Sequence, residues 1–195
     1  MMKRIFSLMV AAAMVLCGAE GLLPMAMAEA TDAGSDWYMA VLTDAEITEQ
    51  FPYRAFADVN GDGVPVLFIS TKEDSFIGDE DHARLYACVD GEAKQLMEIG
   101  GNAGEQFYVN TEEQTITYFY RYSGEGHIEV YNLKDGALEL VTKADSYGPF
   151  HAPDGENAEQ VYMQDDEPID EAAHEALMDK YANEKDMIAY TKGDE

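Results

Sequence analysis

Asp-Gly pairs recur between short β-rich runs, and this feature limits the fold more than any other in the sequence. The pairs are Asp90-Gly91 and Asp135-Gly136, and each lies between two runs of β-forming residues. Both central residues of a type I′ hairpin turn need positive φ, which Asp and Gly adopt more readily than other residues. Strands joined by such short turns pair in sequence order. The pattern therefore predicts an antiparallel β-meander.

Further β-rich runs at 64–69, 106–110 and 115–120 bring the expected meander to about seven or eight strands. The stretch 145–168 is rich in glycine, proline and acidic residues, which favours an exposed loop. Within it, Gln160–Met163 is expected to form an edge strand, and 187–190 is expected to close the sheet as a last short strand.

A helix is expected at each end of the meander. Residues 36–42 place Trp37, Ala40 and Val41 on one helical face. Asp170 can cap a helix that runs to about Tyr181, with an apolar stripe suited to packing on the sheet. The fold class is therefore α+β. Because no long linker interrupts the chain, residues 29–195 are expected to form a single domain.

The N-terminus has the three parts of a secretory signal peptide. A positive Met1–Arg4 segment precedes an apolar run that ends near Ala19, and Ala26-Met27-Ala28 offers the small-x-small pattern for cleavage. Cleavage after Ala28 would remove residues 1–28 and export the remainder. Ala30 is the second choice of cleavage site. The alternative is an uncleaved N-terminal membrane anchor, which is disfavoured because polar and helix-breaking residues interrupt the run before it can span a membrane. No stable membrane insertion is expected after cleavage.

Two cysteines are present, and neither predicts a disulfide in the exported chain. Cys17 lies in the signal segment, and Leu16 before it does not match the small residue that lipid attachment requires. Cys88 is the only cysteine after residue 28, so it has no internal partner. Its apolar strand context favours a buried core thiol over pairing with a second molecule.

Acidic residues outnumber basic ones by 39 to 12, which gives a formal net charge of −27. Such a chain repels phosphate backbones and anionic lipid surfaces, so nucleic acid and membranes are excluded as expected partners. Cations and basic proteins remain attractive partners on electrostatic grounds.

One loop has a pattern typical of calcium ligation. Asp58, Asn60 and Asp62 supply side-chain oxygens at positions 1, 3 and 5, glycine occupies position 6, and Val64 can offer its carbonyl at position 7. Calcium is a hard cation that prefers such oxygens. The alternative is a hairpin turn that Asx and glycine residues stabilise without any ion. The sequence leaves both open.

This loop resembles the calcium loops of FG-GAP repeats, dockerins and EF-hands. It is still more similar to small secreted proteins of Gram-positive bacteria, functionally uncharacterised, with Asp-x-Asp-Gly-Asp-Gly-x-Pro-Glu-Leu before an apolar strand. This chain departs by having Val66 where that pattern has Glu. The resemblance implies a signal peptide, a short helix, a tyrosine-rich meander and a terminal helix.

Other chemistry-bearing residues form only weak patterns. The four histidines share no metal-ligand spacing, and His174 is expected to be exposed and inert. Alternation places Tyr118, Tyr120 and Tyr122 on one strand face, where they could stack on sugars or peptides or, as favoured here, pack into the core. No catalytic motif is present in the sequence.

The favoured function is a secreted non-enzymatic accessory or binding module, with the Asp58–Gly63 loop as its candidate structural calcium site. Two alternatives stay open: a secreted hydrolase of an extracellular polymer, and an acidic inhibitor or surface protein that binds a basic partner. The candidate ligands are therefore an extracellular glycan, a peptide or a basic protein. Catalytic residues are not predicted, and the enzyme question leans toward no.

Overall fold

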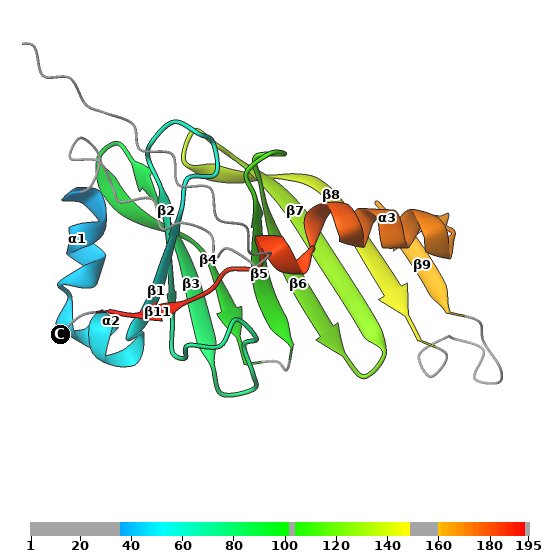
Figure 1. The fold of residues 1–195 in the computed structure, drawn as a ribbon, viewed down its shortest axis with the longest axis horizontal. Coiled ribbons are helices and arrows are strands. Elements are labelled where there is room, and N and C mark those ends of the chain that lie inside the picture. Colours follow the sequence, from blue (N-terminus) through cyan, green and yellow to red (C-terminus); the bar gives the residue numbers. More distant parts are fainter. Residues whose placement is uncertain (1–35, 102–103, 149–159, 194–195) are drawn as a thin grey trace, which may run out of the picture.

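The computed structural model describes residues 36–101, 104–148 and 160–193. The expected signal peptide, the cleavage site at Ala28 and Cys17 lie outside these residues, so those expectations stay predictions. The described chain is mainly β, with two antiparallel sheets and three short α-helices (Figure 1).

The first sheet has five strands in the order β11-β1-β2-β3-β4. Its strands are β1 (Tyr53–Ala57), β2 (Val66–Ser70), β3 (His82–Val89), β4 (Glu92–Gly100) and β11 (Thr191–Lys192). Four consecutive strands pair with their sequence neighbours, as hairpin connections dictate. The C-terminal β11 returns to pair with β1.

The second sheet has six strands in the order β10-β9-β8-β7-β6-β5. Its strands are β5 (Glu105–Asn110), β6 (Thr115–Tyr122), β7 (Glu125–Lys134), β8 (Ala137–Tyr147), β9 (Val161–Gln164) and β10 (Glu167–Ile169). This sheet is an uninterrupted antiparallel meander. A bulge between Val130 and Tyr131 shifts the register of β7 against β8.

The helices are α1 (Asp36–Leu42), α2 (Ala45–Gln50) and α3 (Glu171–Tyr181), and a 3-10 turn follows at Glu184–Asp186. The carboxylate of Asp170 accepts a 2.8 Å hydrogen bond from the backbone N–H of Ala173, so it caps α3 as the sequence predicts. Asp44 caps α2 in the same way.

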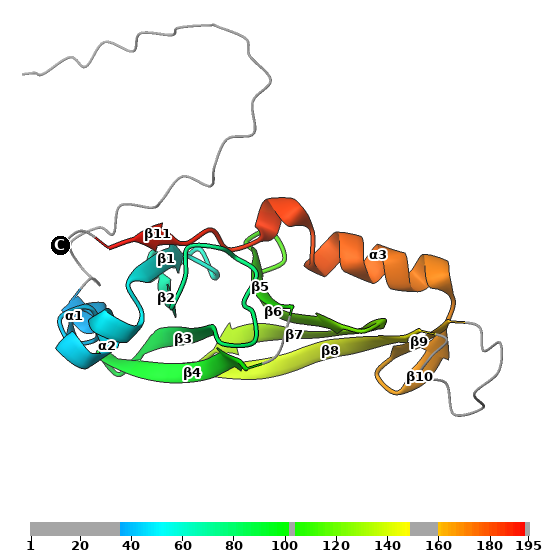
Figure 2. The same ribbon diagram turned by 90° about the horizontal axis from the view of Figure 1, so that it is seen from below.

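Three apolar clusters hold these elements together. The largest joins the inner faces of the two sheets and includes Phe68 and Phe107, whose ring centroids are 5.3 Å apart. A second packs α1 and α2 on the outer face of the five-stranded sheet. A third packs α3 on one side of the six-stranded sheet, and no described helix covers the other side of β6–β9 (Figure 2).

The predicted meander with a helix at each end is confirmed in outline. Asp90-Gly91 and Asp135-Gly136 form hairpin turns with positive φ at all four residues, from 49° to 84°. The helix predicted at 36–42 is also confirmed. Among the described residues no helix is long and apolar enough to cross a membrane.

Two details of the sequence interpretation are wrong. Among the described residues, eleven strands form two sheets, of five and six strands, rather than one meander of seven or eight. The last strand is β11 at Thr191–Lys192, while Met187 makes only an isolated bridge to Tyr108. The strand predicted at Gln160–Met163 is confirmed as β9, although β10 rather than β9 forms the sheet edge. Residues 149–159 of the predicted loop lie outside the described residues.

Candidate functional site

The loop predicted to bind calcium joins β1 to β2 and is closed by its own side chains. Oδ2 of Asp58 accepts a 3.0 Å hydrogen bond from the N–H of Gly63, and Oδ1 of Asp62 accepts a 2.8 Å bond from the N–H of Val64. Gly61 and Gly63 have φ of 68° and 81°, a region that strongly favours glycine. These contacts are those of an Asx-stabilised turn.

One atom of this loop fits a cation. Oδ1 of Asp58 is shielded from solvent and has no hydrogen-bond partner. A carboxylate oxygen in that position costs free energy unless a donor or a cation meets it. The side chain of Gln114 donates a 3.0 Å hydrogen bond to the carbonyl of Asn60 from outside the loop. The loop therefore keeps one carboxylate oxygen without a partner, while hydrogen bonds within the protein hold the rest of it in place.

Further side-chain ligands beside the loop are scarce among the described residues. Within the described ranges, no group of three or more His, Cys, Asp or Glu side chains is placed to hold a metal ion. Asp81, in the connection between β2 and β3, forms a 3.2 Å ion pair with Lys72. The candidate calcium ligands are thus the side chains of Asp58, Asn60 and Asp62 and the carbonyl of Val64.

A second candidate site is the side of β6–β9 that faces away from α3, which we call the open face. Phe119, Ile128, Val130 and Ala144 pack toward α3, so alternate residues point to the other side. Strand pairing arranges the open face in rows across the sheet. The rows are Tyr122, Glu125, Tyr147 and Val161; Tyr120, His127, Asp145 and Met163; and Tyr118, Glu129 and Lys143.

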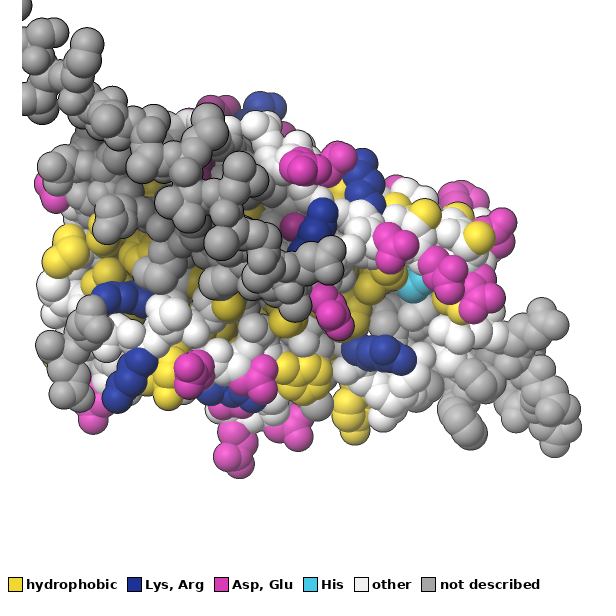
Figure 3. All heavy atoms as spheres, viewed as in Figure 1, with side chains coloured by type: hydrophobic (Ala, Val, Ile, Leu, Met, Phe, Trp, Pro, Cys, Tyr) yellow, Lys and Arg dark blue, Asp and Glu magenta, His cyan; other side chains and the backbone are white. Residues whose placement is uncertain are grey.

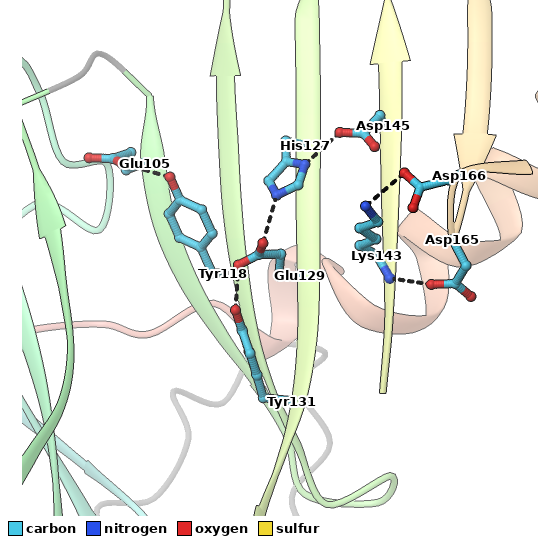
Figure 4. Close-up of polar contacts among 9 residues, drawn as sticks. All are labelled: Glu105, Tyr118, His127, Glu129, Tyr131, Lys143, Asp145, Asp165 and Asp166. Atoms are coloured by element: carbon cyan, nitrogen blue, oxygen red, sulfur yellow. Dashed lines mark hydrogen bonds and ion pairs between the residues drawn. The ribbon is translucent and has the colours of Figure 1, made fainter. Parts of the chain in front are cut away.

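His127 stands at the centre of the open face between two carboxylates (Figure 4). Its Nδ1 lies 2.6 Å from Oδ1 of Asp145, and its Nε2 lies 3.3 Å from Oε1 of Glu129. The ring of Tyr118 meets the imidazole edge-on at 6.2 Å between centroids. A neutral imidazole has one N–H, so only the protonated ring donates to both carboxylates.

Two tyrosines of this region give their hydroxyl protons to carboxylates. Tyr118 donates a 2.7 Å hydrogen bond to Glu105, and Tyr131 donates to Glu129. Burial and then the hydrogen bond to the neighbouring carboxylate raise the pKa of both phenols well above the usual value. These hydroxyls therefore stay protonated and act as donors, not as nucleophiles.

Lys143 is the basic side chain of the third row, and it is already paired. Its Nζ lies 2.7 Å from Asp166, and its backbone N–H donates a 2.9 Å hydrogen bond to Asp165. The hydrogen bond to Asp166 raises the pKa of the lysine. The lysine charge is thus balanced at the edge of the open face by the β9–β10 turn.

On the other side of the sheet, a cavity of about 220 Å³ lies between α3 and the strands. His174 lines it, half-buried, with its ring 4.8 Å from that of Tyr162. The prediction that His174 is exposed is therefore wrong, and burial lowers its pKa. Figure 3 shows this side of the molecule, where acidic side chains gather over α3.

The predicted tyrosine alignment is confirmed, because Tyr118, Tyr120 and Tyr122 share one face. Their environments differ, however. Tyr118 packs against the central core, whereas Tyr122 is 54 % exposed. Cys88 is free and packs partly buried against the α1–α2 cluster.

The contacts of His127 were not predicted from the sequence. His127 and Asp145 are 18 residues apart, and only the β7–β8 register brings them together. Alternating polar residues at His127 and Glu129 were the available indication that one face of β7 meets solvent or polar partners.

Comparisons with known proteins add little to this geometry. The chain matches no protein-family model and no solved structure. It is 27 % identical over 129 residues to a human protein named diacylglycerol kinase iota. The match covers 64 % of this chain but only 12 % of that much longer protein. A partial likeness of this size does not place the chain in a kinase family.

Proposed function

We propose that this protein is a secreted, non-enzymatic binding module whose ligand surface is the open face. The observation that carries the proposal is the first row of that face. Tyr122, Tyr147 and Val161 lie on the same side of neighbouring strands and are 54 %, 37 % and 40 % exposed. Large exposed side chains that gather in one patch are typical of interaction surfaces, whereas single exposed ones are common on any protein surface.

The chemistry of the open face suits recognition rather than catalysis. A general base needs a ring nitrogen free to take a proton from substrate. In His127 both nitrogens face carboxylates. The tyrosine hydroxyls are engaged as donors to Glu105 and Glu129. A hydrolase mechanism therefore has less support than binding by aromatic and polar contacts.

The calcium proposal concerns the stability of the fold. Asp58, Asn60, Asp62 and the carbonyl of Val64 would ligate the ion, and the solvent-shielded, unpartnered Oδ1 of Asp58 supports this assignment. Bound calcium supplies positive charge to a loop that holds two carboxylates. Its role would be to fix the β1–β2 connection.

Ligand binding can be tested with a panel of neutral and acidic polysaccharides and of basic, neutral and acidic peptides. We expect a member of the panel to bind without being cleaved, and binding to be lost in Tyr122→Ala/Tyr147→Ala. Met39→Ala, which removes a side chain 46 % exposed on α1, is the matched control and should bind normally. Cleavage of a polymer that His127→Gln abolishes would show that the protein is an enzyme.

Export is tested separately. Mass spectrometry of the protein recovered from the culture medium should find Glu29 at the N-terminus. Recovery in the cells only, or with residues 1–28 retained, would contradict secretion by signal-peptide cleavage.

A further inference from the structure

We propose that a cavity between α2, β1 and β11 binds an organic monocarboxylate, with Arg54 holding the carboxylate and apolar side chains holding the rest of the ligand. The site belongs to the five-stranded sheet, so it is independent of the open face and of the function proposed for that face. It is carried by the juxtaposition of a half-buried guanidinium that has no anionic partner with the apolar walls of a cavity.

The cavity combines apolar walls with basic groups. Its volume is about 370 Å³, and Leu42, Phe51 and Pro52 supply apolar lining. Arg54 and Lys192 line it as well. Figure 3 shows basic and hydrophobic side chains next to one another near α2. Apolar walls with a few charged or polar groups are typical of sites for small ligands.

Strand register places the Arg54 side chain on the side of the sheet that α2 covers. Arg54 pairs with Ile69 of β2, and Ile69 pairs with Arg84 of β3, so the three residues form one row. Ile69 packs in the apolar cluster of α1 and α2. A Cβ at Gly193 would stand 3.4 Å from Nη1 of Arg54, so glycine leaves room beside the guanidinium. The arginine therefore faces the cavity and not the core between the sheets.

The two arginines of this row differ in how their charges are balanced. Nε of Arg84 lies 2.9 Å from Oε2 of Glu98, and its guanidinium lies 4.3 Å over the ring of Phe51. The guanidinium of Arg54 has neither an ion pair nor a hydrogen bond in the described part of the chain. Acidic residues outnumber basic ones by 39 to 12, so an arginine without a carboxylate is unexpected here. Its several N–H donors are available to an anion from outside the chain.

The guanidinium and the charge of the protein together define the anion. Arginine forms paired N–H···O bonds with a carboxylate or a phosphate group. The chain carries a formal charge of −27, and its field opposes a phosphate dianion more than a single negative charge. The apolar walls favour an apolar group beside that charge. A free organic acid and the C-terminus of a peptide both present this chemistry.

Glu49 also lines the cavity, and its charge opposes the same ligand. Among the described residues it forms no ion pair with Arg54 or Lys192. The ionised groups that line the cavity are thus two positive and one negative. Removing Glu49 should therefore strengthen binding, whereas removing Arg54 should weaken it, and this difference in sign tests the site.

Binding can be measured by two-dimensional NMR of the isotope-labelled protein, which detects weak ligands. The probes are hexanoate and N-acetyl-alanyl-leucine, and their uncharged counterparts are hexanamide and the amide of the same dipeptide. We expect at least one carboxylate to bind and to shift resonances of α2 and β1. Its uncharged counterpart and inorganic phosphate should bind about tenfold more weakly. Comparison of the two carboxylates distinguishes a free acid from a peptide C-terminus.

Single variants separate this site from general charge effects. Arg54→Gln should weaken binding about tenfold, and Lys192→Gln should weaken it less. Arg121→Gln is the matched control, because Arg121 is exposed on the other sheet and has no ion pair among the described residues. Glu49→Gln should strengthen binding about threefold, whereas Glu46→Gln, on the same helix but outside the cavity, should have little effect. Circular dichroism confirms that each variant is folded.

Equal weakening by Arg54→Gln and Arg121→Gln, equal binding of the uncharged probes, tighter binding of phosphate, or no binding of either carboxylate would each overturn the proposal. Asp194 and Glu195 follow Gly193 in the sequence, so Asp194→Asn/Glu195→Gln is measured as well. If the probes bind only to that variant, the chain's own carboxylates fill the cavity, and the proposal of an external ligand fails.

Discussion

The hydroxyl of Tyr118 donates a 2.7 Å hydrogen bond to Oε1 of Glu105, a residue that is only 3 % exposed. The other oxygen, Oε2, is buried without a hydrogen-bond partner. The Tyr118 hydroxyl therefore stabilises, by hydrogen bonding, a carboxylate that is shielded from water. It also ties β6 to β5 beside the open face.

Tyr118→Phe should lower the free energy of unfolding by about 2 kcal/mol, because it leaves a buried carboxylate without this donor. Tyr122→Phe removes a hydroxyl from an exposed ring and should change it by less than about 0.5 kcal/mol. Urea denaturation measures both. Glu105→Gln in the Tyr118→Phe background should recover part of the loss, since the buried charge is gone. A neutral effect of Tyr118→Phe would mean that another group supports Glu105.

Calcium should raise the midpoint of thermal unfolding by about 5 °C when it is present at roughly 100 times its dissociation constant. Asp58→Asn keeps an acceptor for the N–H of Gly63 but loses the carboxylate, so it should abolish the rise. Asp74→Asn is the matched control, because Asp74 accepts a 3.0 Å hydrogen bond from Phe76 in a similar turn. Magnesium at equal ionic strength corrects for general screening. Coincident curves with calcium and with chelator would show a turn that needs no ion.

The protein should lose stability as the pH falls from 7 through 6.5, the ordinary pKa of histidine, toward the lower pKa of His174. Burial disfavours the charged ring in the folded state, so in that window the unfolded chain binds more protons. His174→Gln should flatten this part of the stability profile. NMR titration of the His174 ring supplies the direct check, with a midpoint below 6.5 expected. A midpoint at or above that value would contradict the burial argument.

Gly136→Ala should destabilise the contact between the two sheets. A Cβ at Gly136 would lie 2.4 Å from Cγ2 of Val89 in the other sheet, and φ is already 69°. Overpacking and backbone strain together should cost about 3 kcal/mol. Gly91→Ala carries only the strain, because nothing lies within 4 Å of its Cβ position, and should cost about 1 kcal/mol. Equal losses in chemical denaturation would show that Val89 moves aside freely.

The local parts of the fold could be predicted because they depend on neighbouring residues. Asp135-Gly136 forms a turn since both residues tolerate positive φ. Asp170 caps α3 since its carboxylate reaches the N–H of Ala173 three residues on. The loop at 58–64 was also recognised, together with its alternative as a turn without an ion. The short strand β10 at Glu167–Ile169 was not predicted, because glutamate and proline are uncommon in strands.

The sequence by itself determined the hairpins, the helix caps, the acidic charge and the calcium-like loop, because each follows from contacts within a few residues. Only the tertiary structure decided that the chain divides into two sheets after Gly100, that α3 covers one side of the second sheet, and that His127 meets Asp145. These features depend on strand register, on the bulge at Val130 and on which apolar faces pack together. Such long-range pairings come from burial shared across the whole core, which no short segment encodes.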